Sequence, residues 1–157
     1  MFKLITILAV LPAIAFSASP MSTCLRTSHP LPTAVFFGGR VSPCLAEPCP
    51  VFRSVGSGTT YIDFTPNRQI TALRPELRAR VIGLNIQHPL PQDMQDNPFN
   101  YIIGSTNPIA ANTPVTFNLT VPVEPDTPLV SSTNIFTLFD QNNQVIFCYE
   151  IATVVRA

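Results

Sequence analysis

The sequence predicts an all-β protein in which two antiparallel sheets pack face to face as a sandwich. First, 17 of the 157 residues are proline, and each proline fixes φ and lacks the backbone N–H that a helix interior needs. Second, short segments rich in apolar and β-branched residues recur between Pro, Gly, Asn and Asp. Third, the one segment that could form a helix, residues 71–81, has Pro75 near its centre. The length suits a single domain with a sizeable core.

Each expected strand is bounded by a turn signal. Within residues 78–86, Ile82, Leu84 and Ile86 occupy alternate positions and should share one face. Residues 140–143, Asp-Gln-Asn-Asn, are typical of a turn and should return the chain into a closing hairpin. The expected strands are residues 59–64, 78–86, 115–123, 133–139 and 145–155.

Residues 115–123 show the clearest alternation, with apolar residues at every odd position and polar residues or proline at every even position. A period of two places the odd side chains on a buried face. Asn118 should therefore point outward, where the Asn118-Leu119-Thr120 sequon can carry an N-linked glycan. Several such short strands, without internal repeats or a dividing linker, predict an immunoglobulin-like β-sandwich.

The N-terminal segment has the pattern of a secretory signal peptide. Met1-Phe2-Lys3 supplies a positive start, residues 4–16 form an apolar run interrupted by Pro12, and small residues follow at positions 17–19. The apolar run is too short to span a bilayer. We expect residues 1–17 to be removed, with cleavage between positions 17 and 19, and residues 18–157 to form one secreted domain.

All four cysteines, Cys24, Cys44, Cys49 and Cys148, lie in the expected mature domain. An even number of cysteines in a secreted chain predicts disulfides, and three pairings are possible. Cys44 and Cys49 bracket a proline-containing segment that can turn back on itself, and a local bridge there would leave Cys24 to pair with Cys148. A zinc site is disfavoured, because the Cys-x4-Cys spacing has no second close pair.

Composition excludes several classes of function. Only 11% of residues are charged and the formal net charge is zero, so no basic surface is available to neutralise a nucleic-acid backbone. His29 and His88 each adjoin a proline, and neither accompanies a nucleophile motif. The carboxylates are scattered along the chain. We therefore expect no enzyme activity, no metal and no cofactor.

The hydrophobic content is the remaining observation. Apolar residues make up 46% of the chain, mean hydropathy is +0.28 and tryptophan is absent. Sandwich sheets usually enclose large side chains, whereas the inner faces expected here are β-branched. The composition allows two kinds of interior: an ordinary close-packed core, or sheets that separate around an apolar cavity for a lipid.

Several motifs, taken in order, resemble a known family. Residues 41–49, Val-Ser-Pro-Cys-Leu-Ala-Glu-Pro-Cys, resemble the Ser-Pro-Cys-x3-Pro-Cys signature of Niemann-Pick type C2-like proteins. Residues 121–125 resemble that family's Leu-Pro-Val segment, and residues 107–109, Asn-Pro-Ile, stand where Cys-Pro-Ile is usual. Residues 147–151, Phe-Cys-Tyr-Glu-Ile, resemble Phe-Cys-Trp-Glu-Ile in the family's last strand. The chain thus resembles the MD-2-related lipid-recognition (ML) family, to which the group 2 mite allergens also belong.

The resemblance implies one β-sandwich that binds a single apolar ligand, usually a sterol or a fatty acid, between its sheets. It also implies the disulfides Cys24–Cys148 and Cys44–Cys49. Family motifs identify some of the candidate cavity residues. The inward-facing residues of segments 59–64 and 115–123 are added to them as further candidates. The candidate cavity residues are Ile62, Phe64, Ile82, Leu84, Ile86, Leu90, Phe117, Leu119, Val121, Val123, Phe136 and Tyr149.

The chain departs from the family pattern around the expected cavity mouth. The family's third disulfide is missing, since its two positions correspond to Pro98 and Asn107. Leu90 stands where the family has a phenylalanine, and Thr127 stands where it has another aromatic residue. The mouth should therefore be less aromatic than in the sterol carriers. Fatty acids and other chain-like lipids are thus candidate ligands beside sterols.

We expect a secreted, monomeric lipid carrier that acts outside the cell or in the lysosomal lumen and can pass its lipid to a membrane protein. One alternative is a lipid-presenting innate-immune co-receptor of the MD-2 type, and another is a structural sandwich without a ligand. A co-receptor should have basic residues around the mouth to bind lipid phosphates. The expected mouth segments, residues 87–93 and 124–128, contain no arginine and three carboxylates, which disfavours that role.

Overall fold

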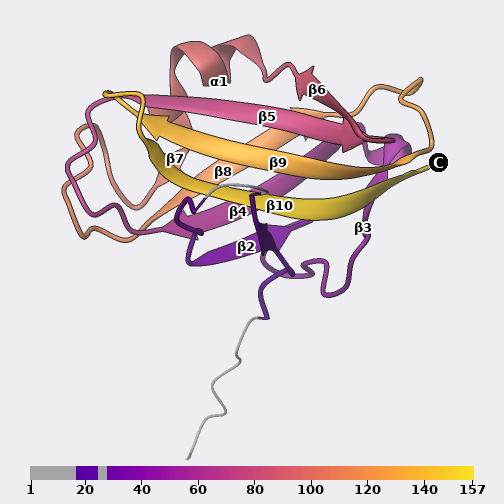
Figure 1. Cartoon of the computed structure of the whole chain (residues 1–157), viewed down its shortest axis with the longest axis horizontal. Helices are drawn as coiled ribbons and strands as arrows, with labels where there is room; N and C mark the ends of the chain where they lie inside the picture. Colours follow the sequence, from indigo (N-terminus) through magenta and orange to yellow (C-terminus); the bar gives the residue numbers. More distant parts are fainter. Residues whose placement is uncertain (1–16, 25–27) are drawn as a thin grey trace, which may run out of the picture.

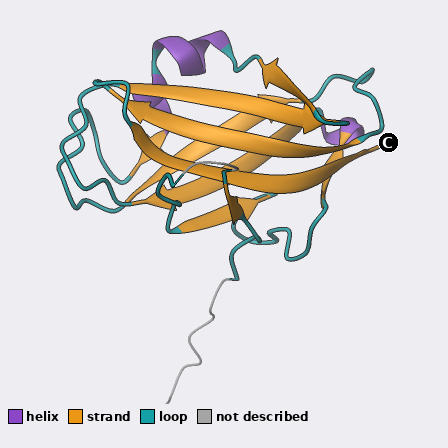
Figure 2. Ribbon diagram, viewed as in Figure 1, coloured by secondary structure: helices purple, strands orange, loops and turns teal. Residues whose placement is uncertain are grey.

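The computed structural model describes residues 17–24 and 28–157. Residues 1–16, and with them nearly all of the expected signal peptide, lie outside the described residues. Within the described part, ten strands and very little helix form two β-sheets that pack face to face (Figures 1 and 2). The predicted all-β sandwich is confirmed.

The larger sheet has the strand order β1-β10-β9-β5-β6, and β3 pairs in parallel with the end of β10. Its other pairings are antiparallel. In Figure 1 its three long strands, β5, β9 and β10, lie side by side across the front. The strands are β1 (Ser22–Thr23), β3 (Cys49–Phe52), β5 (Leu73–Val81), β6 (Leu84–His88), β9 (Ser131–Asp140) and β10 (Val145–Arg156).

The smaller sheet has the order β2-β4-β8-β7 and lies behind, with its strands oblique to those in front (Figure 1). Its strands are β2 (Ala34–Phe37), β4 (Ser57–Phe64), β7 (Ile102–Ile103) and β8 (Val115–Pro122). A short 3₁₀ turn, η1 (Arg53–Val55), precedes β4. The chain passes from β6 to β7 through the helical turn α1 (Gln92–Asp96) and the 3₁₀ turn η2 (Pro98–Tyr101).

Most of the expected strands are present where the alternation placed them. The segments 59–64 and 115–123 form β4 and β8, which are neighbours in the smaller sheet. The segments 133–139 and 145–155 form β9 and β10, joined by the predicted turn.

The strand expected at residues 78–86 is wrong, because a hairpin turn divides it. Ile82 and Gly83 lie between β5 and β6 and have positive φ angles of 49° and 78°. Glycine adopts such a backbone without steric cost, so Gly83 permits a two-residue turn at this point. Ile82 and Leu84 consequently lie in or beside the turn, 92% and 68% exposed, and Ile86 of β6 is itself 52% exposed.

An aromatic cluster fills the interior from the β9–β10 turn to the middle of the sandwich. Phe64 and Phe117 of the smaller sheet meet Phe147 and Phe136 of the larger one. The ring centroids are 5.0 Å apart for Phe64–Phe147 and 5.6 Å apart for Phe117–Phe136. All four side chains are buried. Rings at these distances and tilts stabilise the interface beyond the effect of their buried area, and this end of the interior is solid.

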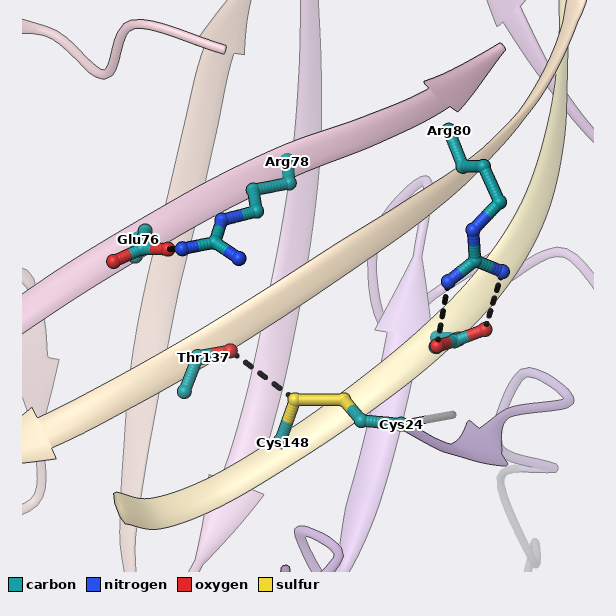
Figure 3. The surroundings of a disulfide bond; sticks show 7 residues. Cys24, Glu76, Arg78, Arg80, Thr137 and Cys148 are labelled. Atoms are coloured by element: carbon teal, nitrogen blue, oxygen red, sulfur yellow. Dashed lines mark hydrogen bonds and ion pairs between the residues drawn. A yellow bond between two sulfur atoms is a disulfide. The ribbon is translucent and has the colours of Figure 1, made fainter. Parts of the chain in front are cut away.

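Both disulfides have the predicted pairing. Cys24–Cys148 links the start of the domain to β10 across a sequence separation of 124 residues, and Cys44–Cys49 closes the loop before β3. Figure 3 shows the long-range bridge on the outer face of the larger sheet, beside Thr137 of β9. The Thr137 hydroxyl donates to Cys148 Sγ at 3.1 Å. The bridge therefore attaches the N-terminal segment to a strand near the middle of the sheet.

Candidate functional site

A cavity of about 360 Å³ lies between the sheets, beyond the aromatic cluster. Its lining residues belong to the end of the sandwich where β5 finishes, β9 begins and β10 runs to the C-terminus. Figure 1 shows where these strand ends lie. Both sheets and the loop after β8, residues 123–130, contribute to its wall. The volume falls in the range of small-molecule binding sites.

The cavity wall follows the alternation of the strands. Because neighbouring side chains of a strand point to opposite faces, every second residue turns inward. From the larger sheet, the lining residues are Val51, Leu77, Ala79, Val81, Ile86, His88, Ser132, Asn134, Phe136, Tyr149, Ile151, Thr153 and Val155. From the smaller sheet and the loop after it, they are Phe37, Gly58, Thr60, Leu119, Val121, Pro122, Val123, Thr127, Pro128 and Val130.

The structure brings together half of the residues that the sequence suggested for a cavity. Those that line it are Ile86, Leu119, Val121, Val123, Phe136 and Tyr149. Ile62, Phe64 and Phe117 are buried in the packed core instead. Leu90, expected at the mouth, is also a core residue and is only 7% exposed. Ile82 lies in the exposed turn of the hairpin, and Leu84, at the start of β6, lies beside that turn and does not line the cavity.

Sequence reasoning missed several lining residues of the larger sheet. Leu77 precedes the strand expected at residues 78–86, and Ala79 lies within that segment but not on the face assigned to Ile82, Leu84 and Ile86. Ser132, Asn134 and Thr153 are polar and therefore do not stand out as members of an apolar wall. The signal that could have found them is alternation: once Phe136 and Tyr149 face inward, residues two and four positions away on the same strands must do so too.

The cavity wall is uncharged. Among the described residues that line it there is no Arg, Lys, Asp or Glu, and most of its side chains are aliphatic or aromatic. The charged side chains of β5 lie on the opposite, outer face of the sheet, where Figure 3 shows Glu76, Arg78 and Arg80. An ionised group inside such a wall would lose its hydration without gaining a counter-charge.

Three polar side chains of the wall form a connected cluster, which we call the β9–β10 polar cluster: Ser132, Asn134 and Thr153. Ser132 Oγ and Thr153 Oγ1 are 3.0 Å apart. Asn134 Nδ2 donates to Thr153 Oγ1 at 3.2 Å. Thr153 is 1% exposed, so these bonds satisfy a hydroxyl that is otherwise cut off from solvent.

Tyr149 lies in the wall between the aromatic cluster and the cavity. Its side chain is 2% exposed, and its ring centroid is 6.1 Å from that of Phe136. Burial raises the pKa of the Tyr149 phenol far above its ordinary value, because the phenolate would be desolvated. Tyr149 therefore presents a neutral surface to the cavity.

A second hollow adjoins the cavity beneath the loop closed by Cys44–Cys49. Its volume is about 490 Å³, and Phe37, Val51 and Gly58 line both spaces. A Cβ atom built on Gly58 would meet no atom within 4 Å. The boundary between the two spaces is therefore thin at Gly58.

Asn118, the residue of the sequon, lies on the face of β8 opposite to the buried Phe117 and Leu119. It is half-buried, and its Oδ1 atom is buried without a hydrogen-bond partner in the described part of the chain. Its glycosylation stays a prediction. Elsewhere among the described residues, no three His, Cys, Asp or Glu side chains gather as a metal site, and no helix is long and apolar enough to cross a membrane.

The fold and the site define a disulfide-bonded β-sandwich whose interior is solid at one end and hollow and uncharged at the other. The model of the ML domain family matches residues 18–155, and the chain belongs to this family. The family membership predicted from the motifs is thereby confirmed.

Two comparisons place relatives beside the chain. NPC intracellular cholesterol transporter 2 from Bos taurus is 26% identical over 117 residues, which cover 74% of each chain. The crystal structure of a Niemann-Pick type C2 protein from the Japanese carpenter ant superposes with a TM-score of 0.69 and 15% identity. That match covers 87% of this chain and 99% of the ant protein, and at this identity it shows that the two share a fold.

Proposed function

We propose that this chain binds one apolar lipid, such as a sterol or a fatty acid, in the cavity between its sheets and carries it through an aqueous compartment. The observation that carries the proposal is the cavity of about 360 Å³, whose wall holds no Arg, Lys, Asp or Glu side chain among the described residues. Protein interiors are normally packed without voids of this size. A mostly apolar space is a favourable environment for a lipid and a poor one for a charged ligand.

Burial of apolar surface supplies the driving force. At roughly 25 cal/mol per Å², a mostly enclosed sterol or long acyl chain gains on the order of 10 kcal/mol before the costs of association. Val121, Leu119 and Ile151 offer close contacts without demanding hydrogen bonds. Binding of this kind needs no covalent step and no metal.

The family supports the same function. The bovine relative is named as a cholesterol transporter, which makes a sterol one candidate ligand. Thr127 lines the cavity at a position where the resemblance implies an aromatic residue. A smaller side chain there supports fatty acids and other chain-like lipids as further candidates.

The proposal includes secretion. The ML domain match begins at residue 18, next to the end of the signal peptide predicted at residues 1–17. Two disulfides suit an oxidising compartment. The mature chain, residues 18–157, would act as a monomer outside the cell or in the lysosomal lumen, and a membrane protein could receive its lipid.

Mass spectrometry of an organic extract tests the proposal. The protein is purified from a secreting host without detergent, and we expect about one apolar lipid molecule per chain. Val121→Trp, which places an indole in the cavity, provides the matched control and should yield less lipid at equal protein concentration. If no lipid is recovered, and added sterol and fatty acid both fail to bind, the carrier function is excluded.

A further inference from the structure

The β9–β10 polar cluster stands at an unusual place. Thr153 is opposite Ser132, and Ile151 is opposite Asn134, in the register between the two strands. On the other side of β9, Asn134 is opposite Ala79 of β5. An amide thus lies on the inner face of the sheet among Ala79, Ile151 and Phe136, all of which line the cavity.

The amide of Asn134 has hydrogen-bonding capacity to spare. A side-chain amide offers two N–H donors and one carbonyl acceptor. Within the described part of the chain, one N–H donates to Thr153, which leaves the second N–H and Oδ1 for a molecule in the cavity. The bond to Thr153, which is itself bonded to Ser132, fixes the amide in place. A fixed donor and acceptor side by side match a hydroxyl group, which both accepts and donates.

We propose that Asn134, positioned by Thr153 and Ser132, hydrogen-bonds an uncharged hydroxyl group on an otherwise apolar lipid. The inference rests on the proposed carrier function and adds the chemical class of the ligand. Apolar pockets commonly use a few fixed polar groups to set orientation and specificity. The hydroxyl end lies at the β9–β10 polar cluster, and the apolar body extends toward Phe136 and Tyr149.

The absence of charge in the wall decides between hydroxyl and carboxylate. An ionised carboxylate transferred from water into an apolar space needs a paired cation, and no Arg or Lys is among the described lining residues. His88 also lines the cavity, and its Nδ1 donates to the carbonyl oxygen of Pro89 at 3.0 Å. The neutral ring therefore offers a ligand only the Nε2 acceptor, which does not pair with a carboxylate. A neutral hydroxyl has a much smaller desolvation cost, which hydrogen bonds to Asn134 can offset. The cluster therefore favours alcohols over ionised fatty acids.

Competition against a fluorescent apolar probe, N-phenyl-1-naphthylamine, tests this on the disulfide-bonded mature chain at pH 8. The competing ligands are tetradecan-1-ol, tetradecane and tetradecanoic acid. The variant Asn134→Leu keeps the size of the side chain and removes its polar atoms. We expect it to lower the affinity for the alcohol about tenfold relative to the alkane, as loss of a buried hydrogen-bonding partner should. In the wild type, the acid should bind more weakly than the alcohol.

The control is Val121→Ala, which shortens an apolar lining residue of the opposite sheet. It should lower the affinity for all three ligands by a similar factor. A direct measurement that needs no variant is the side-chain amide resonance of Asn134. It should shift on addition of the alcohol and not on addition of the alkane.

Two outcomes would overturn the inference while leaving the carrier function intact. One is an unchanged affinity ratio of alcohol to alkane in Asn134→Leu, with an unshifted Asn134 amide resonance in the wild type. The other is tighter binding of the acid than of the alcohol. If neither the probe nor any of the ligands binds the wild type, the carrier function and the inference both fail.

Discussion

Arg80 and Glu150 form a two-pronged ion pair across the strand that separates them. Arg80 Nη2 lies 3.2 Å from Glu150 Oε1, and Arg80 Nη1 lies 3.3 Å from Oε2. The Glu150 side chain is 6% exposed and the Arg80 side chain 25%. Since β9 lies between β5 and β10, this pair connects two strands that share no backbone hydrogen bonds. Figure 3 shows Arg80 on the outer face of the larger sheet, the face that also carries the Cys24–Cys148 disulfide.

Removing the guanidinium should therefore destabilise the larger sheet. Arg80→Met removes both hydrogen bonds from the guanidinium to the largely buried carboxylate of Glu150, and we expect the free energy of unfolding to fall by about 1–3 kcal/mol. Urea denaturation measures this. The matched control is Arg78→Met on the same face of β5, whose side chain is 53% exposed and pairs with Glu76. That variant should lose at most about 0.5 kcal/mol. Equal losses of stability in both variants would contradict a specific stabilising role for the Arg80–Glu150 pair.

Asp140, at the β9–β10 turn, predicts a dependence of stability on pH. Its side chain is fully buried. Burial acts to raise the pKa of its carboxyl, but hydrogen bonds from the N–H of Gln144, from the Arg68 guanidinium and from the N–H of Asn142 outweigh this and hold the pKa below its ordinary value. A carboxylate with a lowered pKa in the folded state stabilises the protein above the unfolded-state pKa, about 3.9, and loses this effect as pH falls through the folded-state value.

Asp140→Asn should thus be about 1–3 kcal/mol less stable than the wild type at pH 7, because Arg68 then meets an uncharged amide. The difference should shrink below about pH 4, where the wild type loses the same charge. Denaturation at a series of pH values measures it. Asp96→Asn, on the exposed side of α1, should follow the wild type at every pH. A difference for Asp140→Asn that stays constant down to pH 2 would rule out the carboxylate as its cause.

The two disulfides should differ in their contribution to stability. In the chain-entropy model, a loop that spans 124 residues gives about 5 kcal/mol, whereas a loop that spans 5 residues gives about 2 kcal/mol. The double variant Cys24→Ala, Cys148→Ala should therefore melt at a lower temperature than Cys44→Ala, Cys49→Ala. Calorimetry under oxidising conditions compares them. The reverse order would mean that strain or residual structure, rather than loop length, governs their effect.

Alternation predicted the strands that have one buried face and one exposed face. It worked for β4, β8 and the β9–β10 hairpin and failed for β5 and β6. Because of Pro75, the sequence did not predict a strand before residue 78. The strand is nevertheless regular there, because β6 pairs with β5 only from Leu77 onward. Pro75 therefore lies where β5 has no partner strand on that side, a position at which a strand tolerates proline. The turn at Gly83 was not predicted, because a single glycine within an apolar segment does not by itself distinguish a turn from a continuous strand.

The apolar part of the candidate site was easier to predict than its polar part. Leu119, Val121 and Val123 followed from the alternation together with the family motif. Ser132 and Thr153 could not be paired from the sequence, because they lie on different strands and meet only through the register of β9 against β10. The extent of the cavity could not be predicted from the sequence either. Phe117 and Leu119 fit the apolar alternation equally well, yet Phe117 lies in the packed core and Leu119 lines the cavity.

A bulky side chain in the cavity should block binding. Val123→Trp should lower the affinity for a fluorescent sterol or fatty-acid probe at least about fivefold, since overpacking costs about 1–3 kcal/mol. The chain has no tryptophan, so the new indole can also report bound probe by energy transfer. Leu84→Trp is the control, because Leu84 is 68% exposed and does not line the cavity. Unchanged probe affinity in Val123→Trp, with a melting temperature several degrees lower, would mean that the space is closed in solution.

Gly58 offers a way to separate binding from stability. A Cβ atom there has open space, and the backbone of Gly58 is not in the positive-φ region that favours glycine. In a β-strand, replacing glycine with a β-branched residue lowers the entropy of the unfolded chain and suits the pleated backbone. We expect Gly58→Val to raise the free energy of unfolding by about 0.5–1 kcal/mol.

The same substitution should also affect binding, since Gly58 lines both the cavity and the neighbouring hollow. We expect it to lower the affinity for long-chain ligands more than the affinity for short-chain ones. Urea denaturation and a chain-length series of fatty alcohols measure the two effects. A loss of stability would show that the space at Gly58 is filled in solution, and equal affinity changes at every chain length would show that ligands do not extend past it.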